Sequence, residues 1–254
     1  MQVLRQGAAG IAHRNRQNLC SKVARAAGGC GALVALQGVD LEVPRGSILG
    51  VIGMNGSGKT TMLNCINGIY TPDEGRIELD GQDIAGRQIH EVARLGVGRT
   101  FQVPRIFRQL SLLDNLDVAQ QQAGRSADER YAQSEYWLHK VELHRLRHNY
   151  AEELSGGQQK LVELARIMVA RPKVVLLDEP FAGVNPALAQ LLISVIRELP
   201  TEHDCSVVLV SHDLTSIYQL SHHIIVMNEG AILCEGDADR VRADPRVVEA
   251  YLGA

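Results

Sequence analysis

The chain of 254 residues is poor in several features that mark whole classes of protein. Aromatic residues make up only 4%, which leaves few platforms for stacking on bases or sugars. Lys and Arg number 26 against 29 Asp and Glu, a net charge of −3, so the basic surplus of a typical nucleic-acid-binding protein is missing and no nucleic-acid partner is expected. No apolar run approaches the roughly 18 residues that span a bilayer, so other chains must make any membrane crossing. The remaining balance is that of a globular α/β protein.

The five cysteines form no CxxC pair, and their number is odd. A disulfide framework and a zinc site are therefore not expected, and a reducing cytosol is favoured. There is also no apolar core of a secretory signal, no internal repeat and no low-complexity segment.

The first 39 residues are basic, with no acidic residue before Asp40. Three interpretations compete: an arm that touches anionic lipid, a segment resembling a transit peptide, or an irregular tail. Because no strand is recognisable in residues 1–29, we predict an irregular basic segment there and a domain over residues 30–254. The basic residues are Arg5, Arg14, Arg16, Lys22 and Arg25.

Apolar runs of strand length alternate with helical patterns through most of the chain. We predict a strand pair over Leu33–Val43, a hairpin at Asp80-Gly81, and a mostly helical region at about 103–170 that includes a helix over Ala127–Leu146. The alternation predicts a mainly parallel sheet flanked by helices. The other predicted strands are Ser47–Ile52, Arg76–Leu79, Val174–Leu177, Ser206–Val210, Ile224–Met227 and Ala231–Cys234, and the other predicted helices are Thr60–Asn67, Gln158–Val169, Pro186–Leu199 and Leu214–Leu220.

A glycine-rich loop between a strand and a helix fits the pattern G-x-x-x-x-G-K-[ST] in full. Its glycines let successive backbone N–H groups point at phosphate oxygens, and the helix N-terminus adds positive potential. Lys59 would contact the β- and γ-phosphates, and the Thr60 hydroxyl would bind Mg²⁺. The predicted nucleotide-binding residues are Gly53, Asn55, Gly56, Ser57, Gly58, Lys59, Thr60 and Thr61.

The run Val174–Leu177 ends in two adjacent acids, Asp178 and Glu179. A buried strand delivers them at the carboxyl edge of the sheet, where ligands bind in open α/β folds. An aspartate there can hold Mg²⁺ directly or through water. Glu179 can then act as the general base that polarises the attacking water.

Together with these two motifs, the segment Leu154-Ser155-Gly156-Gly157-Gln158-Gln159 resembles the signature sequence of the ATP-binding-cassette (ABC) ATPases. Gln102 after Arg99-Thr100-Phe101 is similar to the family's Q-loop glutamine, and His212 in Val210-Ser211-His212-Asp213 is similar to its switch histidine. Asn185 falls in the family's D-loop. The match covers about residues 33–254. It implies a P-loop ATPase fold with a mostly parallel sheet core, an antiparallel β subdomain and a helical subdomain.

The resemblance assigns roles to these residues. Ser155, Gly156 and Gly157 complete the ATP site of a second ATPase subunit, so that two copies enclose two ATP molecules head to tail. Gln102 reaches Mg²⁺ and the attacking water, and His212 contacts the γ-phosphate. The implied catalytic residues are Glu179, His212 and Gln102, and the implied Mg²⁺ ligands are Thr60, Gln102 and Asp178.

Two segments resemble the ATPases of branched-chain amino acid importers, namely residues 181–186 and 244–253, and Gly98–Gln102 points the same way. The resemblance implies transmembrane permease subunits and, indirectly, a periplasmic substrate-binding protein as partners. It implies a cytoplasmic chain peripheral on the inner face of the membrane. Ile106 and Phe107 are candidates for an apolar docking patch, unless they pack inside the helical subdomain.

One position departs from the family pattern, because Cys30 stands near the place of the aromatic residue that usually stacks on adenine. We therefore expect weaker ATP binding than in relatives with the aromatic. ATPases for urea or lipopolysaccharide export have similar C-terminal ends, so another cargo stays open. A second alternative is a cassette protein of repair or translation, but such proteins usually have two cassettes or a long coiled coil, and this chain has neither. A third is a scaffold that binds ATP without hydrolysing it, and the presence of Glu179 and His212 argues against it.

Overall fold

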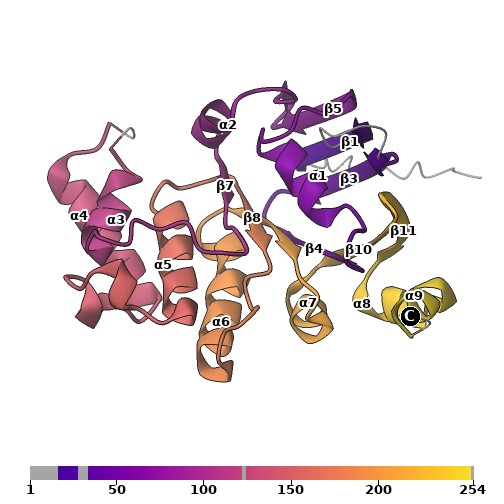
Figure 1. Cartoon of the computed structure of the whole chain (residues 1–254). Coiled ribbons are helices and arrows are strands. Elements are labelled where there is room, and N and C mark those ends of the chain that lie inside the picture. The colour runs from indigo at the N-terminus through magenta and orange to yellow at the C-terminus, as the bar shows by residue number, and fades with distance from the viewer. Residues whose placement is uncertain (1–16, 28–33, 122–123, 253–254) are drawn as a thin grey trace, which may run out of the picture.

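Two sheets of different kinds organise the chain in the computed structural model, which describes residues 17–27, 34–121 and 124–252 (Figure 1). The larger sheet has six strands in the order β11-β10-β4-β9-β8-β7. Its neighbours are parallel except for β10 and β11, which form an antiparallel pair. The strands are β4 (Ile48–Gly53), β7 (Val97–Arg99), β8 (Val174–Asp178), β9 (Ser206–Val210), β10 (His223–Asn228) and β11 (Ala231–Gly236).

The smaller sheet is antiparallel, and β1 (Gln17–Ala27) is its central strand. β1 pairs with β3 (Val39–Pro44) on one side and with β5 (Glu74–Leu79) on the other. The prediction that residues 1–29 contain no strand is therefore wrong for residues 17–27. Two short strands complete the sheet, β2 (Val34–Leu36) and β6 (Gln82–Asp83).

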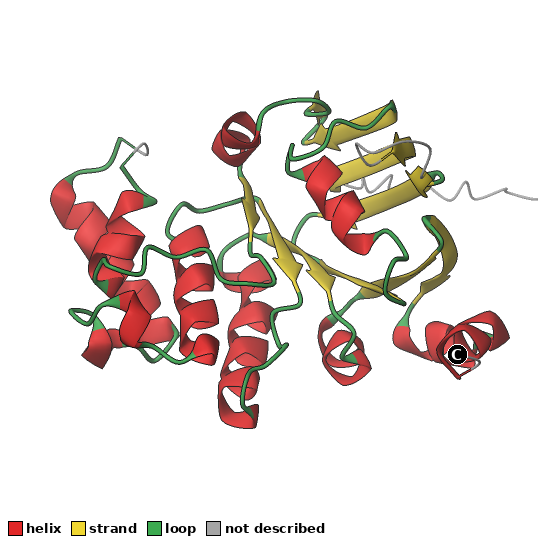
Figure 2. Cartoon of the chain, in the orientation of Figure 1, coloured by secondary structure: helices red, strands yellow, loops and turns green. Residues whose placement is uncertain are grey.

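Helix α1 (Lys59–Ile66) lies between the two sheets (Figure 1). Its buried side chains, which include Met62 and Ile66, pack with residues of both sheets in one apolar cluster. The opposite face of the large sheet is covered by α5 (Gly156–Met168), α6 (Pro186–Glu202) and α7 (Leu214–Leu220) (Figure 2). The core strands β4, β8 and β9 are buried along their whole length, which explains their unbroken apolar sequence.

The helical region contains α3 (Leu112–Val118), α4 (Ala127–Lys140), α5 and the 3₁₀ turns η1 (His144–Leu146) and η2 (Ala151–Glu153). The predicted helix over Ala127–Leu146 ends early, at Lys140. Glu142 has a left-handed backbone with φ of 57°, a conformation that an α-helix cannot continue through. The chain then forms the tighter turn η1.

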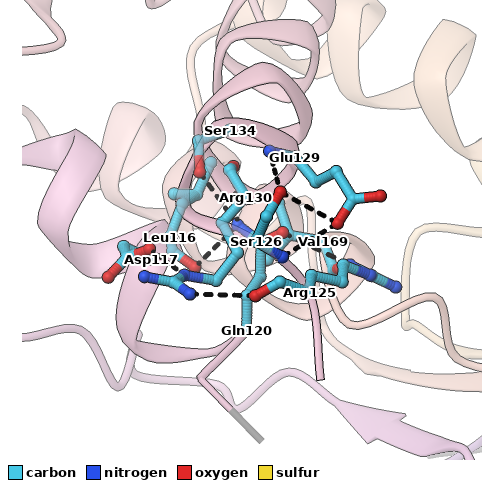
Figure 3. A network of polar contacts seen from close by, with 9 residues as sticks. All are labelled: Leu116, Asp117, Gln120, Arg125, Ser126, Glu129, Arg130, Ser134 and Val169. Carbon is cyan, nitrogen blue, oxygen red and sulfur yellow. Dashed lines mark hydrogen bonds and ion pairs between the residues drawn. The ribbon is translucent and has the colours of Figure 1, made fainter. Parts of the chain in front are cut away.

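A network of polar side chains joins α3, α4 and the end of α5 (Figure 3). The Gln120 amide donates to Ser134 Oγ at 2.9 Å and to the Arg130 carbonyl at 3.1 Å. Arg125 donates to the Val169 carbonyl at 2.8 Å, just past the last residue of α5. The network therefore ties the C-terminal end of α5 to the segment between α3 and α4.

The expected fold class is confirmed, with a mainly parallel core sheet, an antiparallel sheet and a helical region. The hairpin at Asp80-Gly81 is also confirmed, and both turn residues have positive φ, as this two-residue turn requires. The remaining helices are α2 (Ile89–Leu95), α8 (Ala238–Ala243) and α9 (Pro245–Leu252). In the described part of the chain, no helix combines the length and the apolar character that a membrane crossing requires.

Candidate functional site

Four strands of the large sheet, β4, β7, β8 and β9, end at the same edge because they run parallel. The loops that follow them carry the glycine-rich motif, Gln102, the Asp178-Glu179 pair and His212. The fold thus gathers segments that lie more than a hundred residues apart. This carboxyl edge is where ligands bind in open α/β sheets.

The glycine-rich loop leaves β4 at Gly53 and enters α1 at Lys59. Gly58 is the residue before the helix and has φ of 99°, a conformation that favours glycine. A side chain there would also lie 2.8 Å from the Ala35 carbonyl oxygen. At Gly56, with φ of 82°, an added Cβ would meet nothing, so its backbone faces open space. The loop therefore has the exposed backbone that a phosphate cradle needs.

Lys59 is buried under this loop, with 9% of its surface exposed. Its ammonium group donates to the carbonyls of Gly53 at 2.7 Å and Met54 at 2.8 Å and to Ser57 Oγ at 3.2 Å. Burial lowers the pKa of Lys59, while the carboxylates of Glu179 and Asp178 oppose this shift. A positive charge held inside a ring of backbone groups fits a bound triphosphate.

Asp178 ends β8 and is tied to its neighbours in two ways. Its carboxylate pairs with Arg99 at 3.2 Å, and its backbone N–H donates to Thr100 Oγ1 at 3.2 Å. Arg99 also donates to Asn64 Oδ1 on α1 at 2.7 Å. The Arg99 and Asp178 side chains are only 5% and 7% exposed, so this ion pair is largely shielded from water. Arg99 thereby connects β7, β8 and the helix that follows the phosphate loop.

Glu179 and His212 contact each other directly. The Glu179 carboxylate lies 2.7 Å from His212 Nδ1 and accepts the His212 backbone N–H at 3.2 Å. Glu179 has φ of 50°, a strained conformation for a residue with a side chain. The carboxylate thus contacts the loop after β9, in which the His212 side chain is 71% exposed.

Gln102 is exposed in the loop after β7, and its two flanking segments are held by Glu163 of α5. The carboxylate of Glu163 accepts the N–H of Arg105 at 2.8 Å and that of Phe101 at 3.4 Å. Burial raises the pKa of Glu163 to about 7, although the two N–H groups oppose the shift.

Ser155 caps the N-terminus of α5 through a reciprocal pair of bonds with Gln158. The cap explains why α5 begins at Gly156, two residues before the predicted start at Gln158. A Cβ at Gly156 would meet nothing, whereas one at Gly157 would lie 2.9 Å from Leu188. Asn185 likewise caps α6.

A cavity of about 1000 Å³ brings most of the predicted site residues together. Its volume is in the range of ligand sites. Ser57 is buried beneath the loop and does not line it, and neither do Ser155, Gly156 and Gly157. The predicted residues that line it are Gly53, Asn55, Gly56, Gly58, Lys59, Thr60, Thr61, Gln102, Asp178, Glu179 and His212.

Several residues that the sequence analysis gave no role also contribute. Ala35, Gln37, Glu229 and Tyr251 line the cavity. Arg99, Lys160 and Glu163 hold Asp178, the Glu179 loop and the Gln102 loop in turn, and no sequence motif had given them a role. Cys30, named as the position of the usual adenine-stacking aromatic, lies outside the described residues.

Two family models match the chain. The model described as "ABC transporter" matches residues 36–182. The model described as "Branched-chain amino acid ATP-binding cassette transporter" matches residues 231–254.

The curated relatives include the high-affinity branched-chain amino acid transport ATP-binding protein BraF of Pseudomonas aeruginosa. It is 40% identical over 88% of this chain and 93% of its own length. The corresponding protein LivG of Escherichia coli K12 is 38% identical with the same coverage.

Solved structures with the same fold include a nucleotide-free ATP-binding cassette from an ABC transporter, with a TM-score of 0.83 and 32% identity. The match covers 94% of this chain and all of that one. An ATP-binding cassette in its ADP conformation gives a TM-score of 0.82 with 32% identity, over 94% of this chain and 99% of that one. A dimeric cassette bound to ADP and Pi gives 0.77 with 26% identity, over 87% of this chain and 98% of that one.

Proposed function

Since this chain belongs to the ABC transporter ATPase family, we propose that it hydrolyses ATP to energise the import of branched-chain amino acids. The observation that carries the ATPase part is the convergence of Lys59, Asp178, Glu179 and His212 on one cavity at the edge of the large sheet. The cargo rests on the names of the relatives and on the match over residues 231–254.

The phosphate loop binds the triphosphate of the substrate. Backbone N–H groups of the loop bind the phosphates, and the N-terminus of α1 adds its dipole. Lys59 exchanges its bonds to the Gly53 and Met54 carbonyls for phosphate oxygens. A nucleotide therefore replaces contacts that the loop otherwise makes with itself.

Oxygen donors suited to Mg²⁺ surround the cavity, and these are the Thr60 hydroxyl, the Gln102 amide and the Asp178 carboxylate. A bound Mg²⁺ would neutralise charge on the β- and γ-phosphates. Arg99 holds Asp178 from the opposite side and fixes its orientation.

Glu179 accepts a proton from the attacking water as the general base. His212 holds the Glu179 carboxylate through two contacts, which fixes the direction of its lone pairs. Gln102 orders the water and the γ-phosphate from the other side of the cavity. Because the chain does little covalent chemistry in phosphoryl transfer, the rate depends mainly on this positioning.

A second ATPase subunit completes the site. Ser155, Gly156 and Gly157 do not line the cavity of their own chain, yet the capped helix end that they form offers N–H groups to an anion. We place this end against the nucleotide of the partner subunit. Closing of the dimer excludes water, and hydrolysis lets it reopen.

Permease subunits dock beside the loop that carries Gln102. Val103 is 71% exposed and Phe107 48%, an apolar pair at the surface, and the Arg166 guanidinium lies over the Phe107 ring. Ile106 is half-buried against the core, so it supports the patch from beneath. In this scheme a periplasmic binding protein delivers the cargo to the permeases, and the ATPase stays on the inner face of the membrane.

Two substitutions test the proposal with purified protein, Mg²⁺ and ATP. Lys59→Ala should abolish nucleotide binding and hydrolysis. Glu179→Gln should lower turnover by roughly 10²–10⁴-fold, retain ATP binding and accumulate dimers. Unchanged hydrolysis in Lys59→Ala would reject the site, and unchanged turnover in Glu179→Gln would reject Glu179 as the base. Uptake assays with the co-purifying permeases decide between branched-chain amino acids and another cargo.

A further inference from the structure

Two buried charged residues project from the middle of α5, one turn apart. Lys160 is 9% exposed and Glu163 only 2%. Burying a charge is costly unless it is satisfied by hydrogen bonds. The mechanism above uses neither residue as a ligand of the nucleotide, so their retention in the interior requires another reason.

Glu163 binds both ends of the loop that carries Gln102. This loop leaves the sheet after Thr100, whose N–H donates to the Leu176 carbonyl. The carboxylate of Glu163 then accepts the N–H groups of Phe101 and Arg105, the two residues that bracket Gln102 and Val103. The Arg105 guanidinium also lies 4.0 Å from the centre of the Phe101 ring, a second contact between the two ends of the loop.

Lys160 binds the backbone of the loop that carries Glu179. Its ammonium group donates to the carbonyl of Glu179 at 2.8 Å and to that of Ala182 at 2.7 Å. The carbonyl of Glu179 belongs to the residue with φ of 50°, so Lys160 holds the backbone that is strained.

Lys160 and Glu163 attract each other, and Glu179 and Arg166 also lie close enough to stabilise their charges. The space between them is a cavity of about 10 Å³, lined by residues that include Thr100, Leu177 and Pro180. This is the smallest volume that holds a single water molecule. The hydrogen bonds of both side chains nevertheless go to the loop backbones, so both loops are attached to α5.

On the basis of the proposed function, we propose that Lys160 and Glu163 are positioning residues that couple the signature end of α5 to both catalytic loops of the same chain. Ser155 begins α5 and meets the nucleotide of the partner subunit. Lys160 and Glu163 lie one and two turns further along the same rigid helix. A shift of α5 on contact with that nucleotide moves the Gln102 and Glu179 loops, so that occupancy of one site sets the geometry of the other.

The test uses the full chain at pH 8, with ATPase kinetics and hydrogen–deuterium exchange. Glu163→Gln exchanges one acceptor oxygen for an NH₂ group that faces a backbone N–H. We expect kcat to fall about 10-fold, the effect of one hydrogen bond, with KM for ATP within about twofold because the phosphate loop is intact. Exchange should rise in residues 101–105 in this variant, and in residues 179–182 in Lys160→Met.

ATP bound in the same chain also contacts Gln102, so coupling is read from the part of the ATP-induced change in residues 101–105 that depends on Ser155 of the other subunit. In the wild-type chain, ATP should change the exchange of residues 101–105, and Ser155→Ala should weaken that change. In Glu163→Gln the change should be lost, while Glu163→Asp, which keeps the charge, should retain part of it. Glu142→Gln removes an exposed carboxylate from the same region and serves as the matched control.

The proposal is overturned if Glu163→Gln keeps wild-type kcat and wild-type exchange in residues 101–105. It is also overturned if kcat falls only in proportion to the folded fraction measured by circular dichroism. If Glu163→Gln does not fold, Glu163→Asp and Lys160→Arg carry the same test. Absence of ATP hydrolysis in the wild-type chain would instead refute the proposed function itself.

Discussion

Replacing Arg99 by leucine should expose how much the buried Arg99–Asp178 pair contributes to the fold. The two side chains are 5% and 7% exposed, so removing the guanidinium leaves the Asp178 carboxylate in the interior without its cation. Breaking such a pair from one side costs about 3–5 kcal/mol. For a chain of this size each kcal/mol shifts Tm by about 2–4 °C, so we expect Tm to fall by roughly 6–20 °C.

The assay is thermal and urea unfolding of the purified chain without nucleotide. Asp178→Asn combined with Arg99→Leu should be more stable than Arg99→Leu alone, because no charge is left unpaired. Arg76→Leu is the control, since Arg76 is 62% exposed in its pair with Glu78, and it should change stability by less than about 1 kcal/mol. A loss of less than about 1 kcal/mol in Arg99→Leu, or a double variant no better than the single one, would refute this account of Arg99.

Three further predictions follow from single residues. Ser155→Ala removes the cap of α5 and should cost about 1 kcal/mol in unfolding free energy, but it should lower ATP turnover in the dimer by a larger factor than this stability loss explains. Burial raises the pKa of Glu163 from 4.5 to about 7, although the backbone N–H groups of Arg105 and Phe101 and the charges of Arg166 and Lys160 oppose the shift, so the folded chain keeps a proton that the unfolded chain releases between these values. The stability contributed by this proton is present at low pH and is lost as the pH rises from 4.5 to about 7. Urea unfolding midpoints measured across this pH range should therefore fall in the wild-type chain and fall less in Glu163→Gln. Cys30→Tyr should tighten ATP binding measured by titration, and an unchanged affinity would remove Cys30 from the account of adenine binding.

The sequence predicted the nucleotide loop and the core strands because both are local signals. A phosphate-binding loop between a strand and a helix requires glycines and a lysine at fixed spacing. This pattern can be recognised in residues 53–60. Strands buried on both faces, such as Val174–Asp178, read as unbroken apolar runs. The sequence did not reveal β1, because residues 17–27 lack a clear alternation and gain their partners from backbone pairing with two distant strands.

The sequence determined the type of chemistry, because the phosphate-loop pattern around Lys59 and the acidic pair Asp178-Glu179 at a strand end can be recognised locally, and the role of His212 came from the family resemblance. Only the tertiary structure decided how these residues are held, as shown by Arg99 against Asp178 and by His212 against Glu179. The roles of Lys160 and Glu163 also required it, because they hold backbone groups 19 to 62 residues away. Backbone N–H and carbonyl groups are the same at every position, so no sequence pattern shows which of them a buried side chain will bind.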